Sequence, residues 1–487
     1  MRPCLALLSL VAFLGACDTS PDDGIVDVAF IGTAAALYSA DKELAPGAAM
    51  MRAAQRQGLV RFNAEGEVVP ALAERWIVTD DGQSYIFRIT EFDLPGGSRL
   101  TAGAVADELN RAIASLNGTS LGLDLQKVSE IRAMTGRVIE IRLRSPMPGL
   151  LSLLAQPELG VTLRSGETGP MVAQIEEGTA ILEALPPELR GLAPQEDWDD
   201  LVSKVRVRPL AADAAANAFA QGEVDVLLGG TLETLPLAIT GALSRGTVRL
   251  DSPIGLYGID VIRPEGFLAN AANREALALA IDRPALVERF SLGGWSGSTR
   301  IVAAGLPGDD GANGERWASL PIEQRRARAQ ARVGQWRGAT GESPRLSIAL
   351  PTGPGAAFLF DALARDFSAI GITLTRASDA SEADLRLRDT VARYAGARWF
   401  LNQFNCSIAA PVCSQDADFL VQLSLDAASP AEEASYLAEA EQLLTATNLY
   451  IPLGQPVRWS QVRAGVQGYA ENGPAVHPLF PLSRAPI

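Results

Sequence analysis

Alternating apolar and polar residues on both sides of Asp80-Asp81-Gly82 predict a β-hairpin within residues 58–89. An Asp-Gly pair between two such runs favours a tight turn, because the turn requires a positive φ that glycine adopts without strain. A short apolar segment, Val68 to Trp76, leads into the hairpin and ends in an aromatic residue that can anchor it. The pattern therefore predicts a hairpin that lies over a hydrophobic core.

Further elements follow from the same periodicities. Residues 25–31, 138–143 and 223–228 are predicted strands, and the second of them alternates cleanly between apolar and polar positions. Thr101 is predicted to cap a helix, because its hydroxyl can accept a hydrogen bond from a free N–H of the first turn. The apolar residues of this helix share one face: Val105, Leu109, Ala112, Ile113 and Leu116.

The C-terminal half predicts a parallel arrangement. Residues 346–375 read as strand, helix and strand, which is a βαβ unit with a right-handed crossover. Ser429 to Glu432 forms a capping box that opens another helix. The strand predicted at 449–453 contains Pro452, which indicates an edge strand or a strand end. The whole pattern predicts an α/β fold.

The composition narrows the classes of function. The 487 residues predict two or three domains, and 57 acidic against 42 basic residues give a net charge of −15. Such an acidic chain is not expected to bind nucleic acid, which requires a basic surface. The single histidine, His477, disfavours a zinc site and a Ser-His-Asp triad. We therefore expect no metal, no cofactor and no catalytic residue.

The N-terminus has the features of a bacterial lipoprotein signal peptide. Arg2 precedes an apolar stretch, Leu5 to Leu14, that is too short to span a bilayer comfortably. The sequence Leu-Gly-Ala-Cys that ends at Cys17 resembles a lipobox, so residues 1–16 are predicted to be removed and Cys17 to be lipidated. Residues 17–24 would then be a polar tether that holds the protein on the periplasmic side of the cell membrane.

Three motifs, in the order in which they occur, resemble those of one family. Pro-Ala-Leu-Ala-Glu-Arg-Trp at 70–76 precedes the Asp-Asp-Gly turn, Gln-Gly-Glu-Val-Asp lies at 221–225, and Asn-Arg-Glu-Ala-Leu-Ala-Leu-Ala-Ile-Asp-Arg lies at 273–283. Together they resemble the extracytoplasmic solute-binding proteins of ABC importers, in the peptide/nickel-binding family (bacterial solute-binding protein family 5, cluster C). The resemblance extends over about residues 25–485.

This resemblance implies a two-lobed periplasmic-binding-protein fold with mixed sheets and a hinge. Residues 25–255 would form lobe I, to which residues 456–487 return, and residues 256–455 would form lobe II. A ligand would bind between the lobes, close the hinge and present a surface to an ABC permease. The chain is expected to be a monomer and not an enzyme.

The resemblance also suggests ligand-binding residues. Thr33 follows the first strand, which runs into the ligand cleft in the resembled family, with simple turn chemistry after Gly32 as the alternative. Tyr257 and Asp260 lie on the strand that resembles the crossover between lobes. We expect these three residues at the cleft.

A second group of candidates lies where peptide-binding relatives have an aspartate that pairs with the α-ammonium of the ligand. This chain has Asn402 and Asn405 in that region, and Trp399 before them as a candidate wall of the cleft, with core packing as the alternative. An amide cannot balance an ammonium charge, so Asp416 is the candidate that would replace the missing carboxylate.

Cys406 and Cys413 are the two cysteines of the mature chain besides Cys17. In an oxidising periplasm, cysteines seven residues apart can close a small loop, so a disulfide is predicted. Two free buried thiols are the alternative.

Three functions remain open from the sequence. The first is a lipoprotein that delivers peptides or peptide-like solutes to an ABC importer. The second keeps the fold and binds another ligand (a metal chelate, a sugar or a cell-wall fragment), or acts as a sensor without a permease; it is favoured because the His-Asp-Gly and Asp-Pro segments of the resembled family are missing. The third is a hydrolase with paired carboxylates, for which no such pair is visible in the sequence.

Overall fold

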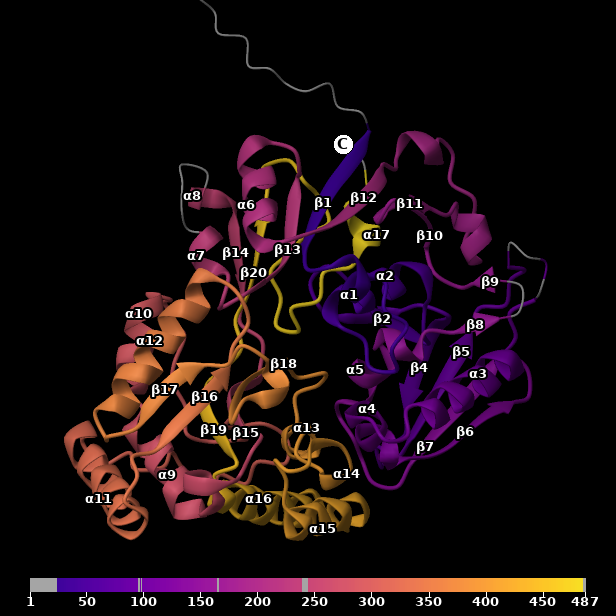
Figure 1. Cartoon of the computed structure of the whole chain (residues 1–487). Coiled ribbons are helices and arrows are strands. Elements are labelled where there is room, and N and C mark those ends of the chain that lie inside the picture. The colour runs from indigo at the N-terminus through magenta and orange to yellow at the C-terminus, as the bar shows by residue number, and fades with distance from the viewer. Residues whose placement is uncertain (1–23, 95–96, 98, 164–165, 239–243, 485–487) are drawn as a thin grey trace, which may run out of the picture.

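The computed structural model describes residues 24–94, 97, 99–163, 166–238 and 244–484. Cys17, the predicted signal peptide and the predicted tether up to residue 23 lie outside the described residues. Three larger sheets organise the described chain (Figure 1). We call the part with the seven-stranded and four-stranded sheets the first lobe, and the part with the five-stranded sheet and α13–α16 the second lobe.

The seven-stranded sheet has β1 at its centre, parallel to both of its neighbours, β12 and β13. In spatial order the strands are β10 (Met171–Glu176), β11 (Thr179–Ala184), β12 (Lys204–Leu210), β1 (Ile25–Ile31), β13 (Val226–Thr231), β20 (Arg458–Val462) and β14 (Val248–Asp251). The bounds of β1 are those predicted from the sequence.

Helices cover both faces of this sheet, which explains why neighbouring residues of β1 are both buried. Val28 packs in one hydrophobic cluster with Leu37 and Met51, whereas Ala29 packs in another with Phe219 and Leu235. These side chains come from α1 (Ala34–Leu37), α2 (Pro46–Gln55), α6 (Ala212–Gln221) and α7 (Leu235–Ala238). The remaining helices of this part are α8 (Ser244–Thr247) and α17 (Leu479–Leu482).

The strand predicted at residues 223–228 begins three residues later than expected, as β13. Gly222 ends α6 in the left-handed region, with φ of +86°, and the N–H of Glu223 still donates to the carbonyl of Ala218. The carboxylate of Asp225 accepts a hydrogen bond from the N–H of Asp27 at 2.9 Å. Residues 223–225 thus complete the helix cap and the connection before the ladder starts.

The predicted hairpin is confirmed within the four-stranded sheet. The sheet consists of β4 (Ala73–Val78), β5 (Ser84–Ile89), β7 (Val138–Leu143) and β6 (Val128–Met134), in this order. Gly82 supplies the positive φ, +67°, between β4 and β5. Helix α3 (Ala102–Ser115) packs on one face and is capped by Thr101, whose hydroxyl accepts from the N–H of Ala104. Shorter elements complete this part: β2 (Val60–Phe62), β3 (Val68–Pro70), α4 (Ser120–Asp124), α5 (Leu150–Leu154), β8 (Thr162–Leu163) and β9 (Gly166–Glu167).

The five-stranded sheet of the second lobe is accompanied by helices α9–α12, in addition to α13–α16. Its strands, in spatial order, are β17 (Thr373–Arg376), β16 (Arg345–Ala349), β18 (Leu385–Val391), β15 (Gly255–Val261) and β19 (Tyr450–Gly454). The helices are α9 (Ala271–Ala280), α10 (Arg283–Phe290), α11 (Ile322–Thr340) and α12 (Pro354–Ser368). The predicted βαβ unit is confirmed, since β16 and β17 are parallel and joined by α12. Strand β19, which contains Pro452, lies at the sheet edge as predicted.

Helices α13–α16 lie below the sheets and bring the two lobes together (Figure 1). They are α13 (Ala397–Asn402), α14 (Cys406–Ala409), α15 (Gln415–Leu423) and α16 (Pro430–Thr447). Trp399 and Leu437 of these helices belong to the same hydrophobic cluster as Phe87 and Ile141 of the four-stranded sheet. The two lobes therefore share a continuous core on this side.

Candidate functional site

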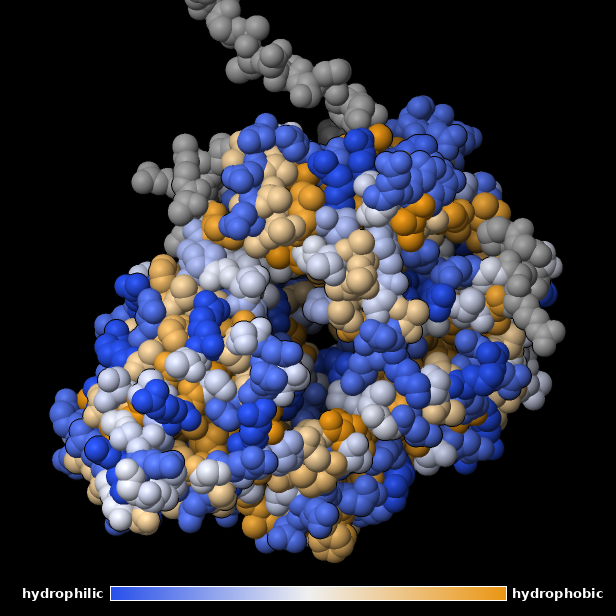
Figure 2. Space-filling model, viewed as in Figure 1, coloured by the Kyte–Doolittle hydropathy of each residue, from blue (hydrophilic) through white to orange (hydrophobic). Residues whose placement is uncertain are grey.

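Two crossings of the chain connect the lobes, one from β14 to β15 and one from β19 to β20. At the return crossing, the carbonyl of Gln455 accepts from the indole N–H of Trp295 at 2.8 Å. The side chain of Gln455 accepts from the N–H of Gly255 at 2.9 Å. Figure 2 shows the molecule hollowed at its centre, with the second lobe at the lower left and the first lobe above and to the right. This hollow between the lobes is the candidate site.

Four polar residues lie at the junction of the two lobes, and we call them the hinge cluster: Glu233 and Tyr257, which are buried, and Asp389 and Arg458, which are partly buried. Tyr257 on β15 donates to Glu233 at 3.0 Å, and Arg458 on β20 forms an ion pair with Asp389 on β18 at 2.9 Å. Glu233 is only 2% exposed. Burial, and secondly the charge of Asp389, raise the pKa of Glu233. The cluster thus links strands of both lobes through hydrogen bonds.

At the opposite side of the hollow, Asp124 at the end of α4 meets α13 of the second lobe. Its Oδ1 accepts from the amide of Asn402 at 2.7 Å and from the hydroxyl of Tyr394 at 3.5 Å. Asp124 is fully buried, and its Oδ2 has no hydrogen-bond partner in the described chain. Burial raises the pKa of Asp124 to about 7, although Asn402 and nearby arginines act in the opposite direction.

Further polar contacts surround Asp124 and also connect the lobes. Lys127 forms an ion pair with Glu433 at 2.6 Å, and the side chain of Lys127 is only 3% exposed. Ser145 donates to the carbonyl of Leu425 at 2.8 Å. Two arginines form ion pairs across the same boundary: Arg144 with Asp426 at 2.8 Å and Arg393 with Glu43 at 3.2 Å. The lobes are therefore in the closed arrangement in this structure.

Four of the predicted ligand-binding residues are buried and have partners within the protein. Tyr257 belongs to the hinge cluster, and Asn402 donates to Asp124. Asp260 is 1% exposed and forms an ion pair with Arg388 at 2.9 Å. Trp399 is 0% exposed and packs edge-on against Phe400, so it adopts core packing, the alternative foreseen from the sequence.

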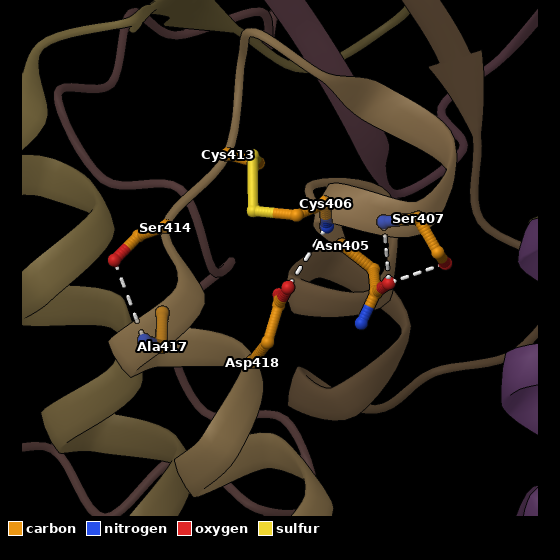
Figure 3. Close-up of a disulfide and its surroundings, with 7 residues drawn as sticks. All are labelled: Asn405, Cys406, Ser407, Cys413, Ser414, Ala417 and Asp418. Carbon is orange, nitrogen blue, oxygen red and sulfur yellow. Dashed lines mark hydrogen bonds between the residues drawn. A yellow bond between two sulfur atoms is a disulfide. The ribbon is translucent and has the colours of Figure 1, made fainter.

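The other three candidates lie nearer the surface. Thr33 is exposed and caps α1 by accepting from the N–H of Ala36. Asn405 caps α14 and accepts from Ser407 (Figure 3). Asp416 is exposed in the first turn of α15. The structure joins Asn402 to the opposite lobe but does not gather the seven residues at one point.

A disulfide joins Cys406 to Cys413 (Figure 3). The carboxylate of Asp418 accepts from the backbone N–H of Cys406 at 2.9 Å, which ties the loop to α15. The hydroxyl of Ser414 accepts from the N–H of Ala417 and caps the same helix. The bridged loop therefore fixes how α15 follows α14.

Several residues that connect the lobes were not predicted. Asp124, Lys127 and Arg393 carry no local signal, because their partners are about 280 to 350 residues away in the chain or on another element. Only the fold shows that Asp124 and Lys127 face α13 and α16.

Three further features of the described residues concern membrane-spanning helices, metal-binding groups and cavities. Within the described ranges, no helix is long and apolar enough to cross a membrane, and no group of three His, Cys, Asp or Glu side chains is arranged to hold a metal ion. Two cavities of about 330 and 350 Å³ lie entirely within the second lobe, the first between α10 and α12 and the second beside α16. Neither cavity lies between the lobes.

Comparison with known proteins identifies the family. Residues 67–401, more than half of the chain, match the model described as bacterial extracellular solute-binding proteins, family 5. A probable deoxycholate-binding periplasmic protein of Escherichia coli is 32% identical over 129 residues, which are 21% of this chain and 23% of that protein. The nickel-binding periplasmic protein of Escherichia coli is 23% identical over 265 residues, which are 51% of this chain and 50% of that protein. The chain thus spans half the length or less of these curated relatives.

The fold agrees with this match. The crystal structure of Haemophilus influenzae OppA in complex with the peptide RPPGFSPFR superposes with a TM-score of 0.80 and 17% identity, covering 95% of this chain and 99% of that one. That protein and the curated relatives are binding proteins, not enzymes. The two-lobed α/β fold and the match over residues 67–401 show that this chain belongs to the family 5 bacterial extracellular solute-binding proteins.

Proposed function

We propose that this chain is the solute-binding lipoprotein of an ABC-type importer. In this proposal it captures a peptide or a peptide-like solute in the hollow between its lobes and delivers it to a permease. The observation that carries the proposal is the set of polar contacts that closes both sides of this hollow, at the hinge cluster and at Asp124. A protein whose lobes close over a solute changes the surface that it offers to a partner.

The second candidate is a protein of the same fold that binds a non-peptide solute, such as a metal chelate, a sugar or a cell-wall fragment. In another form of this candidate, the protein acts as a sensor without a permease. Two observations favour it. The amide of Asn402, near which a peptide ammonium would need a carboxylate, is already bonded to Asp124. The named relatives include proteins for deoxycholate and for nickel, as well as a peptide complex.

The proposal also includes the boundaries of the two lobes and a lipid anchor on Cys17. We propose lobe boundaries at residues 255 and 456, supported by the start of β15 at Gly255 and the return of β20 to the first sheet. Cys17 would carry the lipid that holds a monomeric protein on the periplasmic side of the membrane. Incorporation of labelled palmitate into the wild type, but not into Cys17→Ser, would support the anchor, and equal incorporation would refute it.

Thermal melting of the mature chain against a panel of peptides, metal chelates and muropeptides tests the function. A ligand at about a hundred times its dissociation constant raises the free energy of unfolding by roughly 2.7 kcal/mol. If a peptide hit disappears when the peptide is N-acetylated, a carboxylate holds the ammonium, and Asp416→Asn then tests the proposed residue. A shift with another class alone would support the second candidate. No shift with any class would contradict both.

The seven proposed ligand-binding residues fall into those that can touch a solute and those that are buried in the walls of the hollow. Thr33, Asn405 and Asp416 are the candidates that are not fully buried, so they can meet a solute without rearrangement of the core. Tyr257, Asp260, Trp399 and Asn402 would act by shaping the walls of the hollow, since each is at most 1% exposed. Alanine substitution of each of the first three residues should weaken ligand binding. Thr33→Ala and Asn405→Ala should also lower the melting temperature of the free protein, because each of these two residues caps a helix.

A further inference from the structure

The contact between Asp124 and α13 joins two parts of the chain that must separate if the lobes open. Asp124 ends α4 in the first lobe, and its hydrogen-bond partner Asn402 ends α13 in the second lobe, 278 residues later. Both side chains are at most 1% exposed in the closed arrangement. Each would therefore meet water when the lobes move apart.

Tyr394 fits closely into the first lobe at the same place. A Cβ atom added to Gly149 would lie 2.6 Å from Cδ2 of the Tyr394 ring, which is closer than real Cβ contacts allow. The φ of Gly149 is −81°, which any residue can adopt, so the glycine is needed here for space and not for its backbone conformation. The ring can enter this position only because residue 149 has no side chain.

We propose that Asp124, Tyr394 and Asn402 form a latch that holds the lobes closed, and that this latch is strongest when the carboxyl group of Asp124 is protonated. We call these three residues the Asp124 latch. The inference rests on the proposed function only in that the lobes close over a solute. It assigns the latch to the strength of closure and not to contact with the solute.

Burial explains why a proton strengthens the latch. The Oδ2 atom of Asp124 is buried without a partner, so an ionised carboxylate is only partly compensated in the closed arrangement. The pKa of Asp124, raised to about 7 by burial when the lobes are closed, should return to an ordinary value of about 4 when the lobes are open. A raised pKa in the closed state means that closure is strongest at low pH and weakens as the pH rises through about 7.

The other titratable and charged groups near the Asp124 latch do not make closure weaker as the pH rises. The charges of Arg393 and Arg398 oppose the effect of burial on the pKa of Asp124, and burial holds the pKa of Tyr394 well above its usual value. Lys127, which is paired with Glu433, has a pKa lowered by burial. Loss of its proton at higher pH would favour the closed state, which is opposite to the effect of Asp124.

Small-angle X-ray scattering of the mature chain, with no ligand added, tests the latch. Between about pH 5 and about pH 8 the closing equilibrium constant should fall roughly 100-fold, and the radius of gyration of the wild type should therefore increase. Asp124→Asn keeps an acceptor for Asn402 but cannot titrate, so its radius of gyration should not increase between these two pH values. Asp418→Asn is the matched control, because burial also raises the pKa of Asp418 but that residue bonds within the second lobe.

A second pair of variants keeps the test valid if Asp124→Asn fails to fold. Gly149→Ala should open the lobes at both pH values, whereas Gly293→Ala, whose added Cβ meets nothing within 4 Å, should behave as the wild type. The proposal is overturned if the wild-type radius of gyration is the same at both pH values, if Asp124→Asn follows the wild type, or if Gly149→Ala stays as compact as Gly293→Ala. Because no solute is used, a failure of the proposed transport function would leave this result readable.

Discussion

The hydroxyl of Tyr257 donates a hydrogen bond to the carboxylate of Glu233 at 3.0 Å, across the junction between the five-stranded and seven-stranded sheets. Tyr257 is fully buried and Glu233 is 2% exposed. This bond compensates a carboxyl group that is withdrawn from water at the hinge.

Tyr257→Phe should therefore destabilise the protein. The variant removes one donor and leaves the buried Glu233 with less compensation, so the free energy of unfolding should fall by about 1–3 kcal/mol. Tyr436→Phe is the control, because Tyr436 donates at 3.2 Å to Glu432, which is only partly buried, and the variant should change stability by no more than about 0.5 kcal/mol. Urea unfolding measures the free energy of unfolding of both variants. Equal decreases would show that the bond between Tyr257 and Glu233 stabilises the protein no more than the bond between Tyr436 and Glu432.

A buried ion triad offers a second test. Arg300 contacts Asp309 and Glu441 at 2.9 Å each, and all three side chains are at most 7% exposed. Arg300→Met would leave two carboxylates close together without a counter-charge, and should reduce the free energy of unfolding by about 3–5 kcal/mol. Arg88→Met breaks an exposed pair with Glu74 and should lose about 0–1 kcal/mol. A small loss at Arg300 would mean that water reaches the triad.

The same triad predicts a loss of stability in acid. Burial opposes ionisation of Asp309, but hydrogen bonds from Arg300, Gly305 and Gly311 keep its pKa below the usual value. A carboxyl group with a depressed pKa contributes stability above its unfolded pKa of about 4 and loses it as the pH falls further. Unfolding curves between about pH 3 and pH 6 should show this decrease in the wild type. The decrease should be smaller in Asp309→Asn. If the free energy of unfolding depended on pH equally in both proteins, Asp309 would not be a source of the loss of stability in acid.

Removal of the disulfide should weaken the protein moderately. The bridge between Cys406 and Cys413 closes a short loop, so its loss should reduce the free energy of unfolding by about 2 kcal/mol. Cys406→Ser, Cys413→Ser and the double variant should lose the same amount, because the bridge needs both sulfurs. Thermal melting under non-reducing conditions measures this, and single variants that match the wild type would show that the bridge does not form.

Local patterns predicted much of the fold because local chemistry determines those elements. The hairpin around Gly82, the cap at Thr101 and the edge strand with Pro452 each depend on residues that are adjacent in the sequence. The shift of β13 shows the limit of this approach, since the cap at Gly222 extends over residues that continue the apolar pattern of the strand.

The candidate site was less predictable because it depends on long-range contacts. Asn402 was recognised through its neighbourhood, but nothing near it in the sequence indicates that Asp124 is its partner. Trp399 could have lined a cavity or the core, and only the packing of α13 against the first lobe decides for the core. Charges such as Lys127 become informative only when the fold places Glu433 beside them.

Strand β20 lies between β13 and β14, although it is the last strand of the chain. During synthesis β14 is complete long before β20, and β20 is its only strand neighbour in the sheet. A chain that stops before Arg458 therefore leaves two open strand edges, which are templates for aggregation. The first lobe begins the sequence, and yet its seven-stranded sheet cannot be completed until β20 near the C-terminal end has been synthesised.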